Sequence, residues 1–391
     1  MLALFDIFVL ITAFLQFKRM KTLVTPYILF SIPLTILINV NNLIFADVYD
    51  YYKVTDTVLF YLISFFLLAF ICELIICRKR ISPIKDRYSL GILIDLFFYF
   101  GLLCFVISLF VNYRNYGFEG IKGSNNGILG HMSNIAFALC PIYLIRKIDH
   151  RQKKRSILFI IILFSIAVIY GGKYVIFLNL LYNALAVVLY YKVPQKRIIT
   201  ISIIIISIGI LTFIVIYGLI PYYTGKVKYH SLIDSLYFSM EQFFSYLLSP
   251  IVAMNYSFTH HIENGGEIAF AFANNIIRLI SGNAKYVSPI LPFVFPYAEE
   301  SMTNVSGMVG ELYFELSWGA YVYFIVFFTI VEAAFACYRR KGKYVFILSY
   351  SLSIIVFSFF CNFLSVSGVI LPFMVVIAVD VFESNRHYRR I

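Results

Sequence analysis

The stretch Ile198–Ile220, IITISIIIISIGILTFIVIYGLI, decides the fold of this chain. It carries no charged residue, and a helix of about 20 residues is enough to cross the hydrocarbon core of a bilayer. Its apolar residues form a continuous run and do not alternate with polar ones, which argues against a strand of a membrane β-barrel. Because the backbone must satisfy its own hydrogen bonds inside a bilayer, the stretch is predicted to be a transmembrane α-helix.

Apolar stretches of similar length recur along the chain. Of its 391 residues, 61% are hydrophobic and 13% are charged, and the mean hydropathy is +0.86. This composition excludes an ordinary soluble domain. We predict an all-α fold, a polytopic membrane helical bundle of about 11 transmembrane helices with one large extracytoplasmic loop. The predicted spans are residues 2–17, 23–46, 55–77, 88–112, 131–145, 156–171, 174–191, 198–220, 319–338, 344–361 and 366–382.

Basic residues collect in every second connection between the predicted spans. Examples are Arg78–Arg87 and Arg146–Arg155, and most of the 32 Lys and Arg residues lie on that one side. Cytoplasmic loops of membrane proteins carry such an excess. The chain is therefore predicted to have a cytoplasmic C-terminus and an extracytoplasmic N-terminus. The same rule accounts for most of the net charge of +12, so the charge does not indicate a nucleic-acid partner.

One connection is much longer than all the others. Residues 222–318 separate the eighth and ninth predicted spans. Long ordered loops in compact proteins are usually functional. The predicted organisation is an N-terminal transmembrane bundle of about eight spans at 1–221, a large extracytoplasmic loop at 222–318, and C-terminal spans with a cytoplasmic tail at 319–391.

The composition of this loop changes along its length. Residues 243–256 are apolar but too short to span, so they predict an interfacial or re-entrant helix. A second helix is expected around Asn275–Ile280. Pro289, Pro292 and Pro296 predict an extended segment, because proline does not fit a helix interior. None of the six cysteines lies in the loop, so no disulfide framework is predicted.

Basic residues on the extracytoplasmic side are the first candidates for binding an anion, because positive charge is scarce there. Arg278 lies in an apolar helical stretch, and its guanidinium suits a phosphate. The alternative is an ion pair with a loop carboxylate such as Glu299, Glu300 or Glu311. Lys173 follows two glycines at headgroup depth, where it could also contact any lipid phosphate. Arg114 lies in a glycine-rich loop, for which a solvated surface is the alternative.

Histidine and glutamate residues of the loop are candidates for a general base. His260 and His261 are adjacent, so at most one of them can serve, since neighbouring side chains point in different directions. Glu311 and Glu315 are four residues apart, on one face of a helix that enters the ninth predicted span. A carboxylate there could orient a base or hold a sugar hydroxyl, or it could cap the helix start. No HxxxH or HExxH spacing occurs, so no zinc site is predicted.

The run Thr303–Gly319, TNVSGMVGELYFELSWG, resembles the end of the large periplasmic loop in bacterial oligosaccharide repeat-unit polymerases, the O-antigen polymerases of the Wzy type. Members of that family carry a TNV…G…G.LY.DFG..G run before a span. In this chain Glu315-Leu316-Ser317 stands where Asp-Phe-Gly is usual. The corner Gly171-Gly172-Lys173 resembles a small-residue corner ending in Arg, which occurs in these polymerases and in the O-antigen ligases. The layout of spans and loop is similar as well.

This resemblance implies a glycosyltransferase of lipopolysaccharide biosynthesis in the bacterial inner membrane. Such an enzyme transfers an undecaprenyl-diphosphate-linked glycan onto the terminal sugar of another lipid-linked repeat unit at the periplasmic face. The configuration inverts, and no metal or other cofactor is needed. The expected partners are the lipid-linked donor and acceptor, membrane lipid and a chain-length regulator protein, with no nucleic acid.

The implied chemistry requires a base for the acceptor hydroxyl and cations for the diphosphate leaving group. The resemblance and the position of each residue suggest two sets. The candidate catalytic residues are Arg278, His260, His261 and Glu311, and the candidate substrate-binding residues are Lys173, Arg114, Lys285, Asn304 and Tyr313.

Three other functions fit a polytopic membrane protein of this size. An O-antigen ligase shares the layout and stays open. A flippase for lipid-linked oligosaccharides would keep its charged residues inside the bundle and would have short loops, unlike this chain. A membrane O-acyltransferase would place a His and an Arg in its early spans, and the early spans here have neither.

Overall fold

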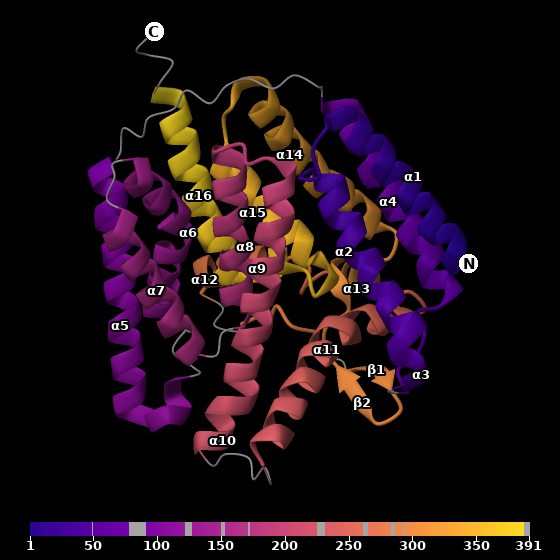
Figure 1. Ribbon diagram of the computed structural model, residues 1–391, viewed down its shortest axis with the longest axis horizontal. Helices are drawn as coiled ribbons and strands as arrows, with labels where there is room; N and C mark the ends of the chain where they lie inside the picture. The colour runs from indigo at the N-terminus through magenta and orange to yellow at the C-terminus, as the bar shows by residue number, and fades with distance from the viewer. Residues whose placement is uncertain are drawn as a thin grey trace. The chain divides into compact units, whose positions relative to one another are not determined.

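The computed structural model describes residues 1–48, 50–77, 91–121, 127–149, 153–170, 173–224, 231–260, 265–282, 286–291 and 294–386 (Figure 1). The regular elements within these residues are helices apart from one two-stranded hairpin, which confirms the predicted all-α fold. The first helices are α1 (Leu2–Met20), α2 (Pro26–Val40), the π-helical turn η1 (Asn41–Phe45), α3 (Ala46–Val48), α4 (Asp56–Ile76), α5 (Gly91–Ile121) and α6 (Gly127–Asp149). They are followed by α7 (Lys153–Tyr170), α8 (Lys173–Tyr190), α9 (Gln195–Phe213), η2 (Ile214–Leu219) and α10 (Ile220–Thr224).

The elements of the second half include those of the predicted loop. They are α11 (Leu232–Ser257), α12 (Ala271–Ile280), β1 (Phe295–Ala298), β2 (Ser301–Thr303), α13 (Gly307–Leu316), α14 (Gly319–Lys341), α15 (Val345–Val356), the 3₁₀ turns η3 (Phe357–Phe359) and η4 (Phe363–Ser365), and α16 (Ser367–Arg386).

Five helical stretches among the described residues are long and apolar enough to cross a membrane. They are Pro26–Val48, Asp56–Ile76, Gly91–Gly117, Gln195–Leu219 and Gly319–Lys341. By length and composition they support a membrane protein. Each predicted span overlaps a helix, whereas the count of about 11 crossings stays a prediction.

The chain forms two compact units that interleave along the sequence. The first comprises Met1–Ser82, Phe244–Lys341 and Ile354–Ile370, and the second comprises Pro83–Phe243, Gly342–Ser353 and Leu371–Ile391. The first unit therefore contains α12, α13 and the hairpin together with the earliest helices. Most of the candidate residues in the described part of the predicted loop belong to this unit.

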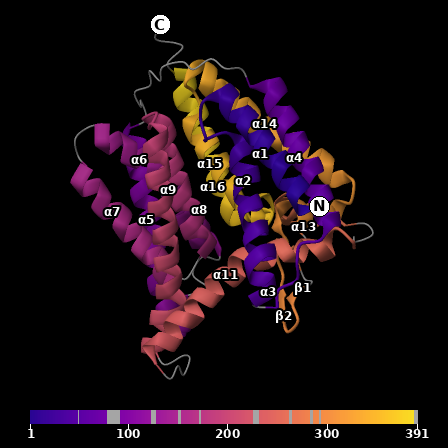
Figure 2. The ribbon, with the colours of Figure 1, turned by 45° about the vertical axis from the view of Figure 1, so that its right-hand side comes forward.

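Aromatic side chains hold the helices of the first unit together. Helices α1, α2, α4 and α14 lie side by side in Figures 1 and 2. The ring of Phe30 on α2 lies 5.1 Å from that of Phe66, 5.2 Å from that of Phe324 and 5.3 Å from that of Phe328. Helix α2 starts where its sequence indicates, because Thr25 accepts the N–H of Ile28 and Pro26 occupies the first helical position.

Ion pairs join α5 and α6, the first two helices of the second unit. Asp95 on α5 contacts Arg146 at 2.6 Å and Lys147 at 2.8 Å, both on α6. Helices α6, α7, α8 and α9 then pack against one another in chain order. Asp95 lies within a predicted span, and its ion pairs with α6 show that it holds these two helices together.

The predicted loop is more regular than its sequence indicated. Helix α11 is a single helix that starts at Leu232, well before the expected 243–256 segment. It starts there because the Ser231 hydroxyl accepts the N–H of Asp234, which is an N-cap. The expected helix near Asn275–Ile280 is confirmed as α12.

The proline-rich part of the loop is non-helical where it is described, as predicted. Pro289 lies in a bend, Pro296 lies in β1, and Pro292 is outside the described residues. The hairpin β1–β2 lies beside α3 (Figure 2), and Ala298 of β1 forms a bridge with Tyr51.

The helix that carries Glu311 and Glu315 does not run into the next helix. Helix α13 ends at Leu316, and Ser317 has φ 49° and ψ −125°, so α14 starts as a separate helix at Gly319. This corrects the expectation of one helix entering the ninth span. A residue with positive φ cannot continue an α-helix.

Candidate functional site

Helix α13 is the centre of the candidate site, and its sequence is the one that carries the family resemblance. Residues Gly307–Glu315 are all buried. Gly307 has φ +63°, and a Cβ there would lie 3.0 Å from the carbonyl oxygen of Phe359. A Cβ on Gly310 would lie 2.7 Å from Ser306 Oγ, which itself hydrogen-bonds Ser257 Oγ of α11 at 2.6 Å. The glycines therefore let neighbouring segments approach α13 closely.

Glu311 joins α13 to the chain that precedes the last helix. Its Oε2 accepts the backbone N–H of Asn362 at 2.8 Å, and its Oε1 accepts the N–H of Ser306 at 3.3 Å. Burial raises the pKa of Glu311 to about 8, although the two N–H donors act in the opposite direction. Glu311 is 8% exposed, and its two hydrogen bonds hold these segments together.

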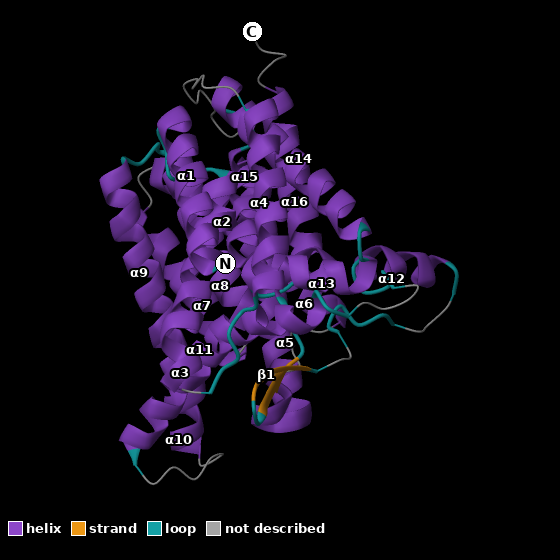
Figure 3. Cartoon of the chain, turned by 90° about the vertical axis from the view of Figure 1, so that its right-hand side faces the viewer, coloured by secondary structure: helices purple, strands orange, loops and turns teal. Residues whose placement is uncertain are grey.

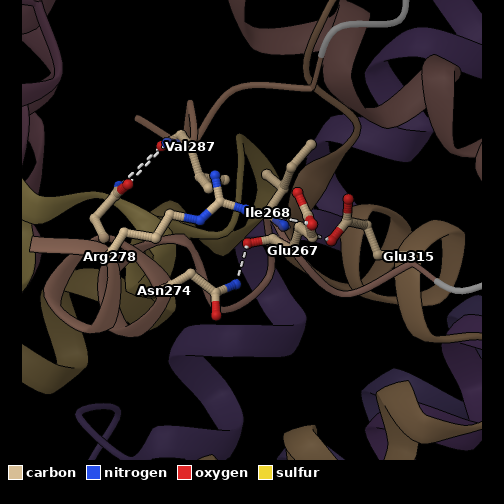
Figure 4. A network of polar contacts seen from close by, with 7 residues as sticks. Glu267, Ile268, Asn274, Arg278, Val287 and Glu315 are labelled. Carbon is tan, nitrogen blue, oxygen red and sulfur yellow. Dashed lines mark hydrogen bonds and ion pairs between the residues drawn. The ribbon is translucent and has the colours of Figure 1, made fainter. Parts of the chain in front are cut away.

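Glu315 fastens the segment that leads into α12 (Figure 4). Its Oε2 accepts the backbone N–H of Ile268 at 3.0 Å and that of Ala269 at 2.8 Å. Burial raises the pKa of Glu315, and these N–H donors act in the opposite direction. A Cβ on Gly265 would collide with the backbone of Glu315, so the chain passes very close to α13 there.

Two asparagines, Asn274 and Asn275, brace α12 itself. Asn275 donates to the carbonyl oxygen of Val287 at 2.9 Å and accepts the N–H of Val287 at 2.8 Å. Asn274 donates to the carbonyl oxygen of Glu267 at 2.9 Å. Helix α12 is thus held by Glu315 at its start and by these two side chains along its length.

Arg278 lies on the braced helix and contacts Glu267 (Figure 4). The distance from its terminal nitrogen to Glu267 Oε1 is 3.5 Å. The sequence suggested Glu299, Glu300 or Glu311 as partner, and the structure shows Glu267 instead. The carboxylate of Glu267 is 68% exposed, and exposed ion pairs at this distance contribute little. The contact between Arg278 and Glu267 is therefore a weak one.

His260 follows the end of α11 and is exposed. Its ring stacks on Tyr256 with centroids 3.9 Å apart and planes at 8°. Nδ1 lies 3.1 Å from the carbonyl oxygen of Tyr256 and 2.9 Å from Thr259 Oγ1. With Nδ1–H donating to that carbonyl, the Nε2 lone pair is the one able to accept a proton. Tyr256 in turn packs on Phe314 of α13, with centroids 6.2 Å apart.

Two further predicted residues lie in or next to α13. Tyr313 is buried and donates its hydroxyl to that of Tyr61 at 3.2 Å, so its ring packs inside the first unit. Asn304 is exposed just after β2 and just before α13, where a ligand can reach it. Five candidates from the sequence therefore belong to the first unit, namely Arg278, His260, Glu311, Tyr313 and Asn304.

The other candidates belong to the second unit or lie outside the described residues. Arg114 is exposed on α5, and Lys173 is the first residue of α8, both in the second unit. His261 and Lys285 lie outside the described residues.

Sequence reasoning missed the residues that do the bracing. Asn275 was not singled out, because its side chain bonds the backbone of Val287. Asn362 was not singled out either, because it donates its own backbone N–H to Glu311. One signal was available, since Gly265 and Gly266 indicate a close backbone approach immediately before Glu267.

Comparison of this chain with protein-family models, with curated proteins and with solved structures found no match.

Proposed function

We propose that this protein is a polysaccharide repeat-unit polymerase of the O-antigen type. It transfers an undecaprenyl-diphosphate-linked glycan to the terminal sugar of a second lipid-linked repeat unit on the extracytoplasmic side of the bacterial inner membrane. The apolar helices support the membrane location, and the Thr303–Gly319 run supports the family assignment.

One observation carries the proposal. The helix bearing the family-like run holds two segments, and each presents a group that the reaction needs. Tyr256 packs on Phe314 and stacks with His260, which supplies a candidate base. Glu315 holds the start of the segment that carries Arg278, which supplies a candidate cation for the diphosphate.

The reaction balances with these groups alone. The acceptor hydroxyl attacks the anomeric carbon of the donor while His260 Nε2 takes its proton. The bond between the anomeric carbon and the diphosphate oxygen breaks, and undecaprenyl diphosphate leaves with the bonding electrons. Attack from the opposite side inverts the configuration. Arg278 exchanges Glu267 for the diphosphate and stabilises its growing negative charge.

The two buried glutamates have a different role in this proposal. Glu311 and Glu315 are positioning residues, because each accepts backbone N–H groups from another segment. Glu315 in particular sets where α12 starts, and so where Arg278 lies. A preorganised cation stabilises a transition state better than a mobile one.

A deletion strain complemented with variants tests the proposal. Loss of a polymerase leaves lipid A-core that bears a single repeat unit, and the wild-type gene restores the ladder of long chains. Loss of a ligase instead leaves lipid A-core bare, with polymer retained on the lipid carrier. Loss of a flippase gives no periplasmic glycan. The single-repeat phenotype supports the proposal, and either of the other two phenotypes contradicts it.

A further inference from the structure

Helix α12 exposes its apolar side and turns its polar side toward the protein. Ile277 is 62% exposed, and Leu279 and Ile280 are each 81% exposed. With 100° between successive residues, Ile276, Ile277, Leu279 and Ile280 share one half of the helix circumference. This exposed half, called the α12 apolar face below, consists of these four residues.

The opposite side of α12 is polar and satisfied by the protein (Figure 4). Asn275 makes two hydrogen bonds with the backbone of Val287, and Arg278 contacts Glu267. Ala271 on the same side is fully buried. An amphipathic helix on the surface of a water-soluble protein has the reverse arrangement, with its apolar stripe facing the protein core. The orientation of α12 is therefore the one expected in contact with an apolar medium.

The contacts of α12 place it next to the start of α14, which is one of the candidate membrane spans. Phe270, which immediately precedes α12, packs against Tyr323 near the start of α14, with ring centroids 5.5 Å apart. Trp318, one residue before α14, is 68% exposed. Exposed Trp and Tyr residues at the ends of spans mark the boundary between water and lipid. In Figure 3, α12 is seen lengthwise and runs across the direction of α14.

We propose that the α12 apolar face lies in the acyl region of the bilayer leaflet next to the start of α14, as an interfacial helix. Such helices lie in the plane of the membrane with their apolar side among the lipid chains. The occupant of this face is membrane lipid. The inference does not depend on the reaction proposed above, but it would place Arg278 at the depth of the lipid phosphates.

Fluorescence quenching by lipid tests this proposal in the full-length protein. Trp318 is the single tryptophan of the chain, so Trp318→Phe gives a silent background. Leu279→Trp in that background reports on the α12 apolar face. Glu300→Trp, at the exposed turn between β1 and β2, is the matched control for a residue in water. Both proteins are reconstituted into phosphatidylcholine vesicles with brominated acyl chains, and their elution volume in detergent checks folding.

The predicted result is a blue-shifted emission for Leu279→Trp that loses most of its intensity in brominated vesicles and resists aqueous iodide. Glu300→Trp should show the opposite pattern. The proposal is overturned if brominated lipid fails to quench Leu279→Trp. Quenching by iodide alone would mean that the face lies in water. Quenching by neither agent would mean that a second copy or another protein covers it. Ile280→Trp, equally exposed, repeats the test if Leu279→Trp does not fold.

Discussion

The Oε2 atom of Glu315 lies 2.8 Å from the backbone nitrogen of Ala269 and accepts its hydrogen bond. The same oxygen accepts the N–H of Ile268. A single buried carboxylate on α13 thus fixes the start of the segment that carries Arg278. If that segment works as proposed, the side chain of Glu315 matters through position rather than through contact with substrate.

Replacement of Glu315 should therefore impair polymer formation in a graded way. Glu315→Ala leaves two backbone N–H groups without an acceptor, which costs about 1–3 kcal/mol of stability per buried group. Glu315→Gln keeps one acceptor oxygen and should retain part of the polymer. Silver-stained glycan ladders from a complemented deletion strain measure the outcome. Equal loss in both variants would mean that the charge, and not the anchoring, is needed.

Arg278 and its partner Glu267 should behave differently on mutation. If Arg278 binds the diphosphate, Arg278→Ala abolishes the ladder, whereas Glu267→Gln leaves it because the cation remains. Arg278→Lys should be intermediate, since an ammonium cannot bind a diphosphate through two parallel hydrogen bonds. Arg278 serves only a structural ion pair if both single variants lose polymer to the same extent.

We expect His260 to act as the general base. His260→Ala is expected to lower the rate of transfer by about 10²- to 10⁴-fold, the usual contribution of a general base. The neighbouring variant His261→Ala is the matched control and should keep most of the activity. Rates are measured with purified protein and a labelled lipid-linked substrate. A larger loss in His261→Ala than in His260→Ala would move the base to the second position.

Glu311 should make stability depend on pH. Its pKa of about 8 lies above the ordinary 4.5, so between these values the folded protein keeps a proton that the unfolded chain has released. Stability should be highest at the acidic end and fall as the pH rises toward 8, by an amount on the order of a few kcal/mol. Glu315, whose pKa is also raised, acts in the same direction.

Thermal unfolding in detergent between pH 5 and pH 8 checks this dependence. The midpoint of wild-type protein should fall with pH, and Glu311→Gln should flatten the profile because its side chain does not titrate. Exposed Glu300→Gln should keep the wild-type slope. A wild-type slope in Glu311→Gln would show that other groups cause the dependence.

The sequence predicts the all-α class and most helix positions, because the hydropathy of a span is averaged over about 20 residues and no single contact alters it. Ile198–Ile220 illustrates this, since it is helical throughout. It also predicts helix α12. The break at Ser317 and the early start of α11 were missed because each depends on a single residue's local geometry, a positive φ in one case and the Ser231 cap in the other.

The surroundings of the candidate side chains could not be predicted for a related reason. Glu311 and Tyr313 were chosen as residues able to touch a substrate, yet both are buried by packing around α13. Burial of a polar residue depends on distant partners such as Asn362 and Tyr61. Nothing near Glu311 or Tyr313 in the sequence indicates those partners.

Elongation by the purified protein tests the central claim most directly. Full-length protein in liposomes is given one undecaprenyl-diphosphate-linked repeat unit as both donor and acceptor, and products are separated by chain length. The polymerase assignment predicts a ladder of lipid-linked oligomers, with one undecaprenyl diphosphate released for each bond formed. If no oligomer longer than the starting unit appears while lipid A-core added to the same liposomes is glycosylated, the protein is a ligase and the assignment is wrong.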